Sequence, residues 1–380
     1  MARLWASQGH KVTLLCSQAY FPEEQRQKEP IVYEQEGVEI HALDVSYDHH
    51  FSFFKRARAF FRFYAKGLAY AFTKLEKPDF ILAYTAPLFV AWLGQRLASR
   101  FDVPWILEIA DVWPDVPIEM GLIPHGPWRP FLRVRTRNAY DSANGIITFS
   151  PGMKDLILAQ GVPSTKVEVS YNGTLMDNWP EIDRNRPESQ PVELLYAGTI
   201  GLANDLSQLL HAMDILEKME DLPAYRLTIL GVGNDLTMVR DEGKRLQLKK
   251  VRFLQRVNRE ELPELFQAAD IGLVSFAPYP ILATNSATKF FDYMAAGLPV
   301  VINYQGWQAQ VLQDANAGLS TPQGDYVALA SNIARLIKDS HLRQEMGKNA
   351  RQYAEKHFDR NDLSVQMWAQ MMAFIDPAKP

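Results

Sequence analysis

Short apolar runs alternate with segments of helical periodicity along the whole chain. An apolar run of about four to eight residues between turn residues is typical of a buried strand, and strands that alternate with helices indicate parallel α/β units. The pattern predicts one sheet in each half. The expected strands are Val12–Cys16, Val38–Leu43, Phe80–Ala83, Trp105–Ile109, Gly145–Phe149 and Val167–Tyr171 in the first half, and Val192–Ala197, Arg226–Leu230, Val251–Leu254, Ile271–Val274, Val300–Ile302 and Gly318–Ser320 in the second.

A polar stretch separates the two halves. Asn172–Pro191 contains three prolines and has no helical or alternating periodicity, as expected of a linker. We therefore predict an α/β protein with two Rossmann-like, doubly wound domains that face each other across a cleft. The first domain covers residues 1–175, the linker residues 176–191 and the second domain residues 192–358.

The beginning of the chain departs from this pattern. A doubly wound domain opens with a strand and a glycine-rich turn, whereas the residues LWASQGHKV are typical of the end of a helix that leads into a second strand. We expect that the first strand and its loop are missing from this sequence, through a misassigned start codon or a truncation.

Composition narrows the class of protein. With 380 residues, 47% of them hydrophobic and 22% charged, the chain is typical of a soluble protein of two domains. A net charge of −4 gives no reason to expect nucleic-acid binding. The single cysteine, Cys16, excludes an internal disulfide and indicates a reducing compartment. Because no apolar run has the length of a membrane span and no signal peptide precedes the first strand, we expect a cytoplasmic protein.

Polar residues precede a helical pattern within Thr284–Val301. Asn285 and Ser286 are favoured N-cap residues, a helix is expected over Ala287–Ala296, and Gly297 follows where this helix ends. The N–H groups at the start of a helix attract phosphate, so this stretch is a candidate anion site.

Two charged side chains share one face of this helix. Lys289 and Asp292 are three residues apart, with the cation nearer the helix start. This spacing suits a diphosphate followed by a ribose diol. It equally suits an ordinary Lys/Asp pair on a surface helix, and the stretch alone leaves both interpretations open.

Glycine turns follow the strands of the second half. Gly198 and Gly201 would let backbone N–H groups approach a diphosphate, although such a turn needs glycine for its dihedral angles in any case. Ligands of open α/β sheets bind beyond the carboxyl ends of the strands. The turns at Gly198, Gly231, Gln255 and Ser275 are therefore expected to share one rim.

Acidic residues surround the end of a strand in Glu108–Asp115, EIADVWPD. Acids at the carboxyl end of a strand are candidates for acid–base chemistry. The alternative is a solvated loop in which Asp111 caps a turn.

The segment Phe51–Phe72 contains five basic residues, nine aromatic residues and no acid. Helical spacing predicts a basic face and an opposite aromatic face, a pattern typical of a helix at an anionic membrane surface. Alternatively, the aromatic residues pack on the core and the bases lie in water. The basic face would hold Lys55, Arg58, Arg62 and Lys66, and the aromatic face Phe53, Phe60, Phe61 and Tyr64.

Metal and hydrolase motifs are absent from the sequence. It contains no H-E-x-x-H, no C-x-x-C, no Asp-x-Asp signature and no G-x-S-x-G, and its closest histidine pair, His49–His50, lies in a polar turn. We expect neither a metal nor a cofactor.

The motifs taken in order resemble a known family. YNG at Tyr171–Gly173, YAGTIG at Tyr196–Gly201, and the stretches LTILGVG, VRFLQRVNREELPELFQAADIGLV and SATKFFDYMAAGLPVV resemble the retaining glycosyltransferases of family four, which have the GT-B fold. DVWPD is similar to a D-L-W-P-E segment of their bacterial WbuB-like branch, whose members assemble O-antigen, capsule and exopolysaccharide. The similarity extends over nearly the whole chain.

The resemblance implies transfer of a sugar from a nucleotide diphosphate donor, usually UDP-linked, to a lipid-linked or saccharide acceptor with retention. It places Asp292 at the ribose, Lys289 and the amides near Ser286 and Gly201 at the diphosphate, and Arg256 near the base. It also implies that residues 359–380 form a helix that crosses back onto the first domain. The donor-binding residues expected on this basis are Gly198, Thr199, Gly201, Arg256, Ser286, Lys289 and Asp292.

The chain departs from the family pattern at several positions. Thr284 stands where the family has the first acid of a Glu, seven residues, Glu pair, and GTIGLAND lacks the usual Arg and Lys. Asp111 stands where many members have His, and Ala110 where Arg is expected.

Three acids are the candidates for catalysis. A retaining transfer without a covalent nucleophile needs the leaving diphosphate stabilised and the acceptor hydroxyl held on the same sugar face. We assign Asp111, with Glu108 and Asp115 as further candidates, to the acceptor side. The rival functions are a UDP-sugar epimerase and a nucleotide-sugar-binding protein without catalysis.

Overall fold

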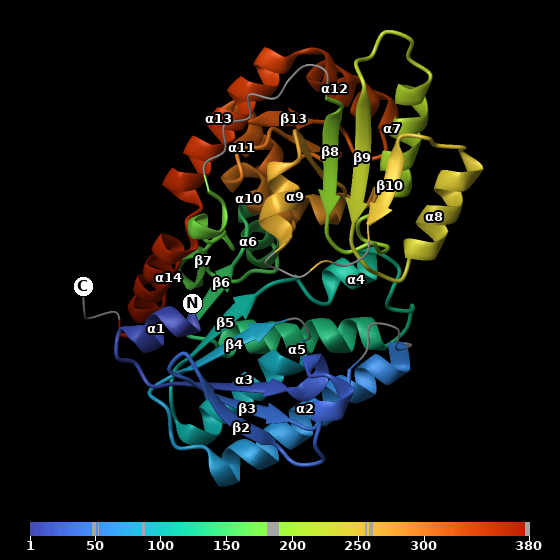
Figure 1. Ribbon diagram of the computed structural model, residues 1–380. Coiled ribbons are helices and arrows are strands. Elements are labelled where there is room, and N and C mark those ends of the chain that lie inside the picture. The colour runs from blue at the N-terminus through green and yellow to red at the C-terminus, as the bar shows by residue number, and fades with distance from the viewer. Residues whose placement is uncertain are drawn as a thin grey trace. The chain divides into compact units, whose positions relative to one another are not determined.

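The computed structural model describes residues 1–47, 51, 53–85, 88–180, 190–254, 257 and 261–376. The chain divides into two compact units (Figure 1). Unit 1 comprises Met1–Ser170 and Ser364–Pro380, and unit 2 comprises Tyr171–Leu363. Of the predicted linker, residues 181–189 lie outside the described residues.

The described residues of unit 1 form two sheets. In the first, of order β1-β3-β2, β1 (Val12–Ser17) runs parallel to β3 (Val38–Leu43), and β2 (Ile31–Gln35) runs antiparallel to β3. In the second, β4 (Ile81–Thr85), β5 (Trp105–Ile109), β6 (Gly145–Thr148) and β7 (Val167–Val169) are all parallel. The strand β2 was not predicted, because its exposed side chains give it no apolar run.

The first strand that the sequence analysis expects to be missing would lie at a sheet edge. β1 and β4 are edge strands of their sheets, and Leu14 of β1 is 44% exposed although parallel strands are ordinarily covered on both faces. A doubly wound order places its first strand next to the second. The existence of such a strand in this protein stays a prediction.

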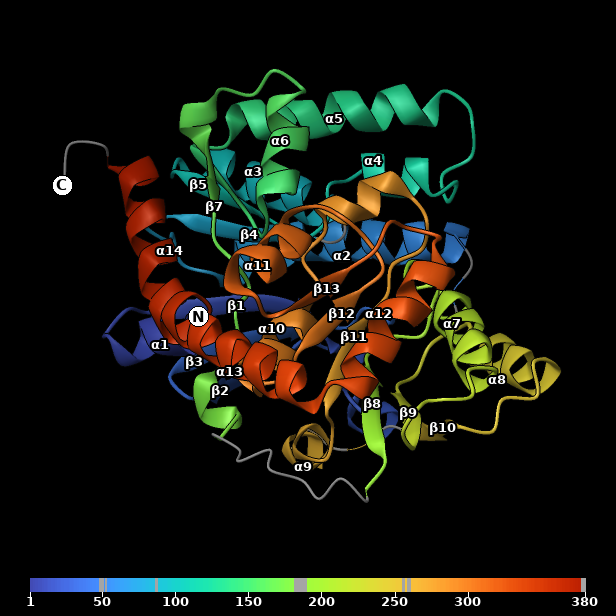
Figure 2. The same cartoon turned by 90° about the horizontal axis from the view of Figure 1, so that it is seen from above.

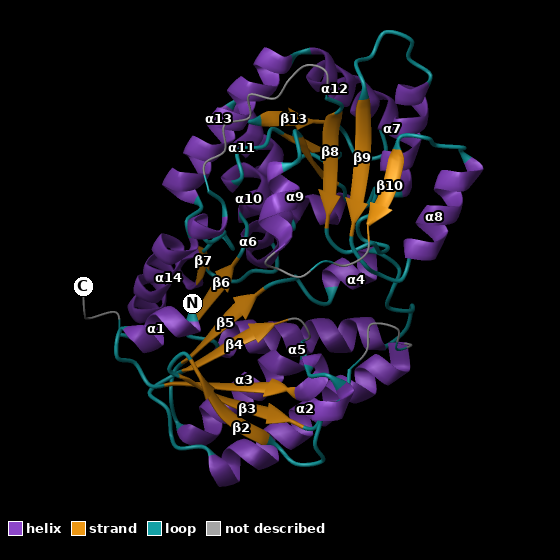
Figure 3. Cartoon of the chain, viewed as in Figure 1, coloured by secondary structure: helices purple, strands orange, loops and turns teal. Residues whose placement is uncertain are grey.

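Helices cover both faces of the second sheet, as the coloured cartoon shows (Figure 3). On one face, α3 (Phe89–Phe101) packs against α2 (Phe53–Lys74) and α5 (Trp128–Ser142). On the other face, Trp5 of α1 (Ala2–Ser7) and Met367 and Met371 of α14 (Arg360–Ile375) enclose Ile106 and Ile147. The short helices α4 (Asp115–Glu119) and α6 (Pro151–Leu158) follow β5 and β6.

Unit 2 is built on a single parallel sheet of order β10-β9-β8-β11-β12-β13. The order reverses between β8 and β11, which pair directly. In open α/β sheets the crevice at this reversal is the usual place for a ligand. The strands are β8 (Val192–Ala197), β9 (Tyr225–Leu230), β10 (Val251–Leu254), β11 (Ile271–Val274), β12 (Val300–Ile302) and β13 (Gly318–Ser320).

Helices also cover both faces of this sheet, as the view from above shows (Figure 2). α7 (Ser207–Glu217) and α12 (Tyr326–Lys338) pack together over a core of buried aliphatic residues. α10 (Thr288–Ala295) covers the opposite face, where its Tyr293 ring lies so close to Gly272 that a Cβ there would be 2.5 Å from the ring. The remaining helices are α8 (Leu236–Arg245), α9 (Leu262–Gln267), α11 (Trp307–Ala315) and α13 (Ser340–His357).

All of the predicted strands are confirmed to within about two residues at each end, the usual uncertainty of strand boundaries. The residues Ser364–Pro380 belong to unit 1, and the buried side chains of α14 reach its core.

The contribution of α14 to unit 1 can be tested by truncating its buried face. Met371 is fully buried, so Met371→Ala should lower the free energy of unfolding by about 2–5 kcal/mol through lost burial and a cavity. Urea unfolding followed by circular dichroism measures this change. Gln366→Ala, an exposed position on the same helix, is the control, and equal stability of both variants would contradict the packing described.

Candidate functional site

The turn after β8 brings a lysine against the backbone. A Cβ at Gly198 would lie 2.6 Å from Cε and 2.8 Å from Nζ of Lys289, so the glycine lets the flexible end of this side chain pass close to the backbone. Lys289 comes from α10, which follows β11, and Gly198 follows β8. The contact therefore lies where the strand order reverses.

The ammonium group of Lys289 is held by neutral partners. Nζ donates to Tyr196 Oη at 2.9 Å and to Asn204 Oδ1 at 3.4 Å, and it lies 4.2 Å from the centre of the Tyr196 ring. Burial lowers the pKa of Lys289 from 10.5 to about 7. Neither of these two partners is an acid, so a bound anion would stabilise the charged form of the lysine.

The segment before α10 corrects one prediction. Asn285 and Ser286 do not cap the helix: Ala287 occupies the N-cap position without a side-chain hydrogen bond. Asn285 Oδ1 and Ser286 Oγ are instead buried atoms with no hydrogen-bond partner in the described part of the chain. Buried polar atoms without hydrogen-bond partners are rare in proteins. At a binding site, such atoms commonly form hydrogen bonds to a bound ligand or to water.

Asp292, one turn further along α10, is held by a residue from the start of unit 2. Its Oδ1 accepts a hydrogen bond of 2.7 Å from Thr174 Oγ1, which in turn accepts one of 2.9 Å from Trp179 Nε1. The structure thus places Lys289 and Asp292 on one helix, with Lys289 next to the glycine turn and Asp292 next to Thr174.

The glycines of the two neighbouring turns have different roles. A Cβ at Gly231 would lie 1.8 Å from the carbonyl oxygen of Gly198, and one at Gly233 would lie 1.9 Å from that of Ile200. These two glycines let the turn after β9 pack on the turn after β8. A Cβ at Gly201 would meet nothing closer than Thr199 Cγ2 at 3.8 Å, so the protein itself leaves space there.

The other donor-side predictions are placed as follows. Thr199 is exposed, and its carbonyl oxygen accepts a hydrogen bond of 2.6 Å from Tyr196 Oη. Ser275 is buried and accepts from Asn303 Nδ2, so its side chain serves the structure. Arg256 and Gln255 lie outside the described residues.

Sequence reasoning missed Tyr196 and Thr174. Tyr196 lies inside the strand β8, and Thr174 reaches Asp292 from 118 residues earlier in the chain. The only available signal was position: Tyr196 begins the quoted motif YAGTIG, and Thr174 directly follows the quoted motif YNG.

The three acids of unit 1 occupy three different environments. Glu108 lies within β5 and is buried, and burial raises its pKa to about 7. Because side chains alternate along a strand, Glu108 shares a face with Ile106, toward α1 and α14. Asp115 begins α4 and is engaged by Arg133 Nε at 3.0 Å and Gln160 Nε2 at 3.1 Å.

Asp111 borders a cavity. The cavity has a volume of about 10 Å³, close to the space of one water molecule, and Trp113, Tyr140 and Thr136 also line it. Thr136 Oγ1 is buried and has no hydrogen-bond partner among the described residues. Burial raises the pKa of Asp111 from 3.8 to about 6. Of the three acids, Asp111 is therefore the one that borders a cavity with room for a polar group.

The described residues contain neither a helix that could span a membrane nor a cluster of metal ligands. No helix there combines the length and hydrophobicity needed to cross a membrane. No three His, Cys, Asp or Glu side chains in these parts of the chain are grouped to hold a metal ion. The expectation of a metal-free site stays a prediction.

Comparison with known proteins bears on the nature of this site. Residues 1–173 match the family described as Glycosyl transferase 4-like domain, and residues 177–353 match Glycosyl transferases group 1. The chain belongs to the glycosyltransferases. Glycogen synthase of Mycobacterium tuberculosis is 26% identical to this glycosyltransferase over 292 residues, which cover 74% of this chain and 66% of the relative. The match thus spans just under two thirds of that relative's length.

Solved structures share the fold of this glycosyltransferase at low sequence identity. Sucrose-phosphate synthase from Thermosynechococcus elongatus aligns with a TM-score of 0.75 and 18% identity over 98% of this chain and 92% of its own. Anabaena HepE in complex with UDP-glucose aligns with a TM-score of 0.66 and 18% identity over 82% of each chain. These likenesses confirm the predicted GT-B fold class.

The different roles of the two turn glycines can be separated by measurement. Gly231→Ala should destabilise unit 2 by several kcal/mol, because the new methyl group would overlap the Gly198 carbonyl oxygen. Gly201→Ala, where space exists, should change the free energy of unfolding by less than about 1 kcal/mol. Chemical denaturation of both variants decides, and a Gly231→Ala protein as stable as Gly201→Ala would disprove the proposed packing of the two turns.

Proposed function

We propose that this glycosyltransferase transfers a sugar from a nucleotide diphosphate donor, a UDP-sugar, to a lipid-linked or saccharide acceptor with retention at the anomeric carbon. The transferred group would be a hexosyl or N-acetylhexosaminyl residue, and the pathway would be assembly of a cell-surface polysaccharide such as O-antigen, capsule or exopolysaccharide. No metal is required. The enzyme would act in the cytoplasm, on the inner face of the cytoplasmic membrane.

The observation that carries the proposal is the position of Lys289. A lysine held by neutral partners, a turn with open space at Gly201 and a helix start without a side-chain cap come together where the strand order reverses. Each of the three favours a diphosphate. HepE, whose fold is similar, was solved with UDP-glucose, which supports a UDP-linked donor.

In the proposed reaction, the ammonium of Lys289 and the first N–H groups of α10 meet negative charge as the diphosphate leaves the sugar. Asp292 would accept hydrogen bonds from the ribose hydroxyls after exchanging its contact with Thr174. Asn285 and Ser286 offer buried oxygen atoms to the donor.

The acceptor side is assigned to Asp111. Its raised pKa leaves the carboxylate charged above about pH 6 and basic enough to accept a proton from an acceptor hydroxyl. The engagement of Asp115 by Arg133 and the position of Glu108 inside β5 make both less suitable.

One observation favours a second candidate function. Thr284 stands where the family has an acid, and its Oγ1 donates to the Ile281 carbonyl oxygen at 2.7 Å, within the turn Pro280–Thr284. A nucleotide-sugar-binding protein without transfer would have no need of that acid. Release of free UDP that depends on an acceptor would exclude both this candidate and a UDP-sugar epimerase.

The donor site is tested by UDP binding as a function of pH. Lys289→Met should weaken binding about tenfold or more at pH 6.5, the worth of a charge-assisted hydrogen bond. Because burial lowers the pKa of Lys289 to about 7, the free wild-type protein loses this charge above pH 7, and its affinity for UDP should fall as the pH rises to 9. Calorimetry at several pH values measures both effects.

Lys244→Met is the matched control, since Lys244 is exposed on α8 of the same unit and pairs with Asp241. It should bind UDP like the wild type at every pH. Wild-type binding by Lys289→Met would remove the lysine from the donor site, and no binding by the folded wild type would refute the site altogether.

The acceptor-side assignment is tested by Asp111→Asn, which keeps the shape but removes the base. Turnover, measured as free UDP released from a UDP-sugar in the presence of a membrane lipid extract, should fall about 10²- to 10⁴-fold while UDP binding stays unchanged. The wild-type rate should fall as the pH drops below about 6, where Asp111 takes up a proton. Turnover at the wild-type rate in Asp111→Asn would assign the proton transfer to another group.

A further inference from the structure

The helix layer on one face of unit 1 is strongly basic. α2 carries six Lys and Arg residues, α3 two and α5 four, while Asp141 is the one acid in the sequences of these helices. The whole chain has a net charge of −4. Positive charge is therefore concentrated on this layer.

The outer side of α2 carries aromatic rings as well as bases. Phe54 is 80% exposed and Phe61 57%, and Arg58 and Arg62 are exposed beside them. The ring of Phe61 lies 6.2 Å from that of Tyr64, a member of the same predicted aromatic face, so part of that face is exposed to solvent. On the predicted basic face, Lys66 Nζ pairs with Asp44 at 2.8 Å.

A second set of exposed rings lies on α5, which the sequence analysis did not single out. Trp128 is 65% exposed, Phe131 46% and Val134 59%. The guanidinium of Arg135 lies 5.6 Å from the centre of the Phe131 ring and 5.9 Å from that of Trp92. α5 therefore repeats the combination of exposed apolar groups and bases found on α2.

Aromatic contacts connect the two helices through α3, which packs against both (Figures 1 and 2). Ring centres lie 6.3 Å apart for Phe60 and Phe89, 4.7 Å for Phe89 and Trp92, and 6.4 Å for Trp92 and Phe131. These ring contacts thus run from α2 across α3 to Phe131 of α5, which is itself partly exposed.

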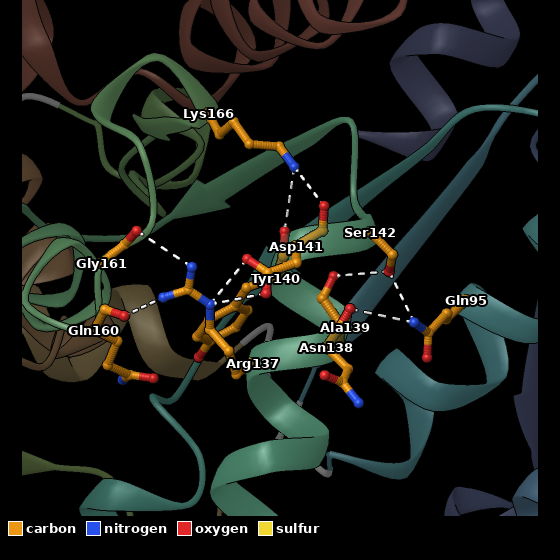
Figure 4. A network of polar contacts seen from close by, with 10 residues as sticks. All are labelled: Gln95, Arg137, Asn138, Ala139, Tyr140, Asp141, Ser142, Gln160, Gly161 and Lys166. Carbon is orange, nitrogen blue, oxygen red and sulfur yellow. Dashed lines mark hydrogen bonds and ion pairs between the residues drawn. The ribbon is translucent and has the colours of Figure 1, made fainter.

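The single acid of these helices is neutralised within the protein. Arg137 Nε donates to both carboxylate oxygens of Asp141 at 2.9 Å, and Lys166 donates to the Asp141 carbonyl oxygen at 2.8 Å (Figure 4). Arg137 also donates to the carbonyl oxygens of Gln160 and Gly161. Arg137 is therefore structural, and Arg58, Arg62 and Arg135 remain exposed for an external partner.

We propose that this surface, called here the basic aromatic face and marked by Phe54, Arg58, Phe61, Trp128, Phe131 and Arg135, docks the protein onto an anionic lipid bilayer. Exposed bases are attracted to anionic lipid, and exposed Phe and Trp rings are stabilised when they enter the headgroup region. The exposed aliphatic side chain of Val134 would form no favourable contact with a nucleic acid. In lipid, it would increase the buried apolar surface. The face extends the membrane contact expected of Phe51–Phe72 to a second helix.

Membrane docking rests on the proposed function in one respect: it would bring the enzyme to an acceptor carried by lipid. Vesicle binding requires neither donor nor acceptor. UDP binding in the absence of vesicles tests the donor site separately, so each proposal can fail without the other.

Co-sedimentation tests the face directly, with vesicles of phosphatidylcholine alone and of phosphatidylcholine mixed with phosphatidylglycerol. The wild type should bind the mixed vesicles at low salt, release them at high salt and ignore the neutral ones. Phe54→Ser/Phe61→Ser on α2 and Trp128→Ser/Phe131→Ser on α5 should each weaken binding about tenfold or more, from lost apolar burial. The control, Met238→Ser/Val327→Ser, removes two comparably exposed apolar side chains of unit 2 and should change nothing.

Vesicle binding is interpreted only for variants that are folded. Thermal melting and circular dichroism establish that each variant is folded. No binding of the wild type to mixed vesicles, equal binding to neutral ones, or undiminished binding by the folded α5 variant would each overturn the proposal. So would displacement of the vesicles by single-stranded RNA at equal charge, which would identify a nucleic acid as the partner.

Discussion

The candidate donor site depends on one close contact, the passage of the Lys289 side chain over the backbone of Gly198. A Cβ at position 198 would lie 2.6 Å from Cε of the lysine, so the glycine allows the lysine its present position. The sheet order brings them together, because β8 and β11 are neighbours and α10 follows β11. The hydroxyl of Tyr196 and the amide of Asn204 then fix the ammonium without neutralising it.

Most of the fold could be predicted from the sequence because buried parallel strands are short apolar runs. β2 escaped prediction because an exposed edge strand has no such run. The N-cap assignment of Asn285 and Ser286 followed local preference, but tertiary contacts determine this segment: Trp307 Nε1 donates to the Asn285 carbonyl oxygen at 2.9 Å. Likewise, no local pattern could show that Thr174 reaches Asp292.

The acids of EIADVWPD show why spacing alone does not define a catalytic group. They lie within eight residues, yet Glu108 points to the α1 side of β5, Asp111 borders a cavity and Asp115 is bound by Arg133 and Gln160. Strand alternation and long-range partners decide among these environments. The sequence could nominate the three residues, and only the structure could rank them.

The placement of α14 has a consequence for protein engineering. Met367 and Met371 of this helix complete the core of unit 1, although both come after unit 2 in the chain. A gene fragment that ends before Ser364 would therefore encode unit 1 without part of its interior. An exchange of the proposed donor-binding unit between relatives by recombination should replace the internal segment Tyr171–Leu363 and retain both ends of the recipient chain.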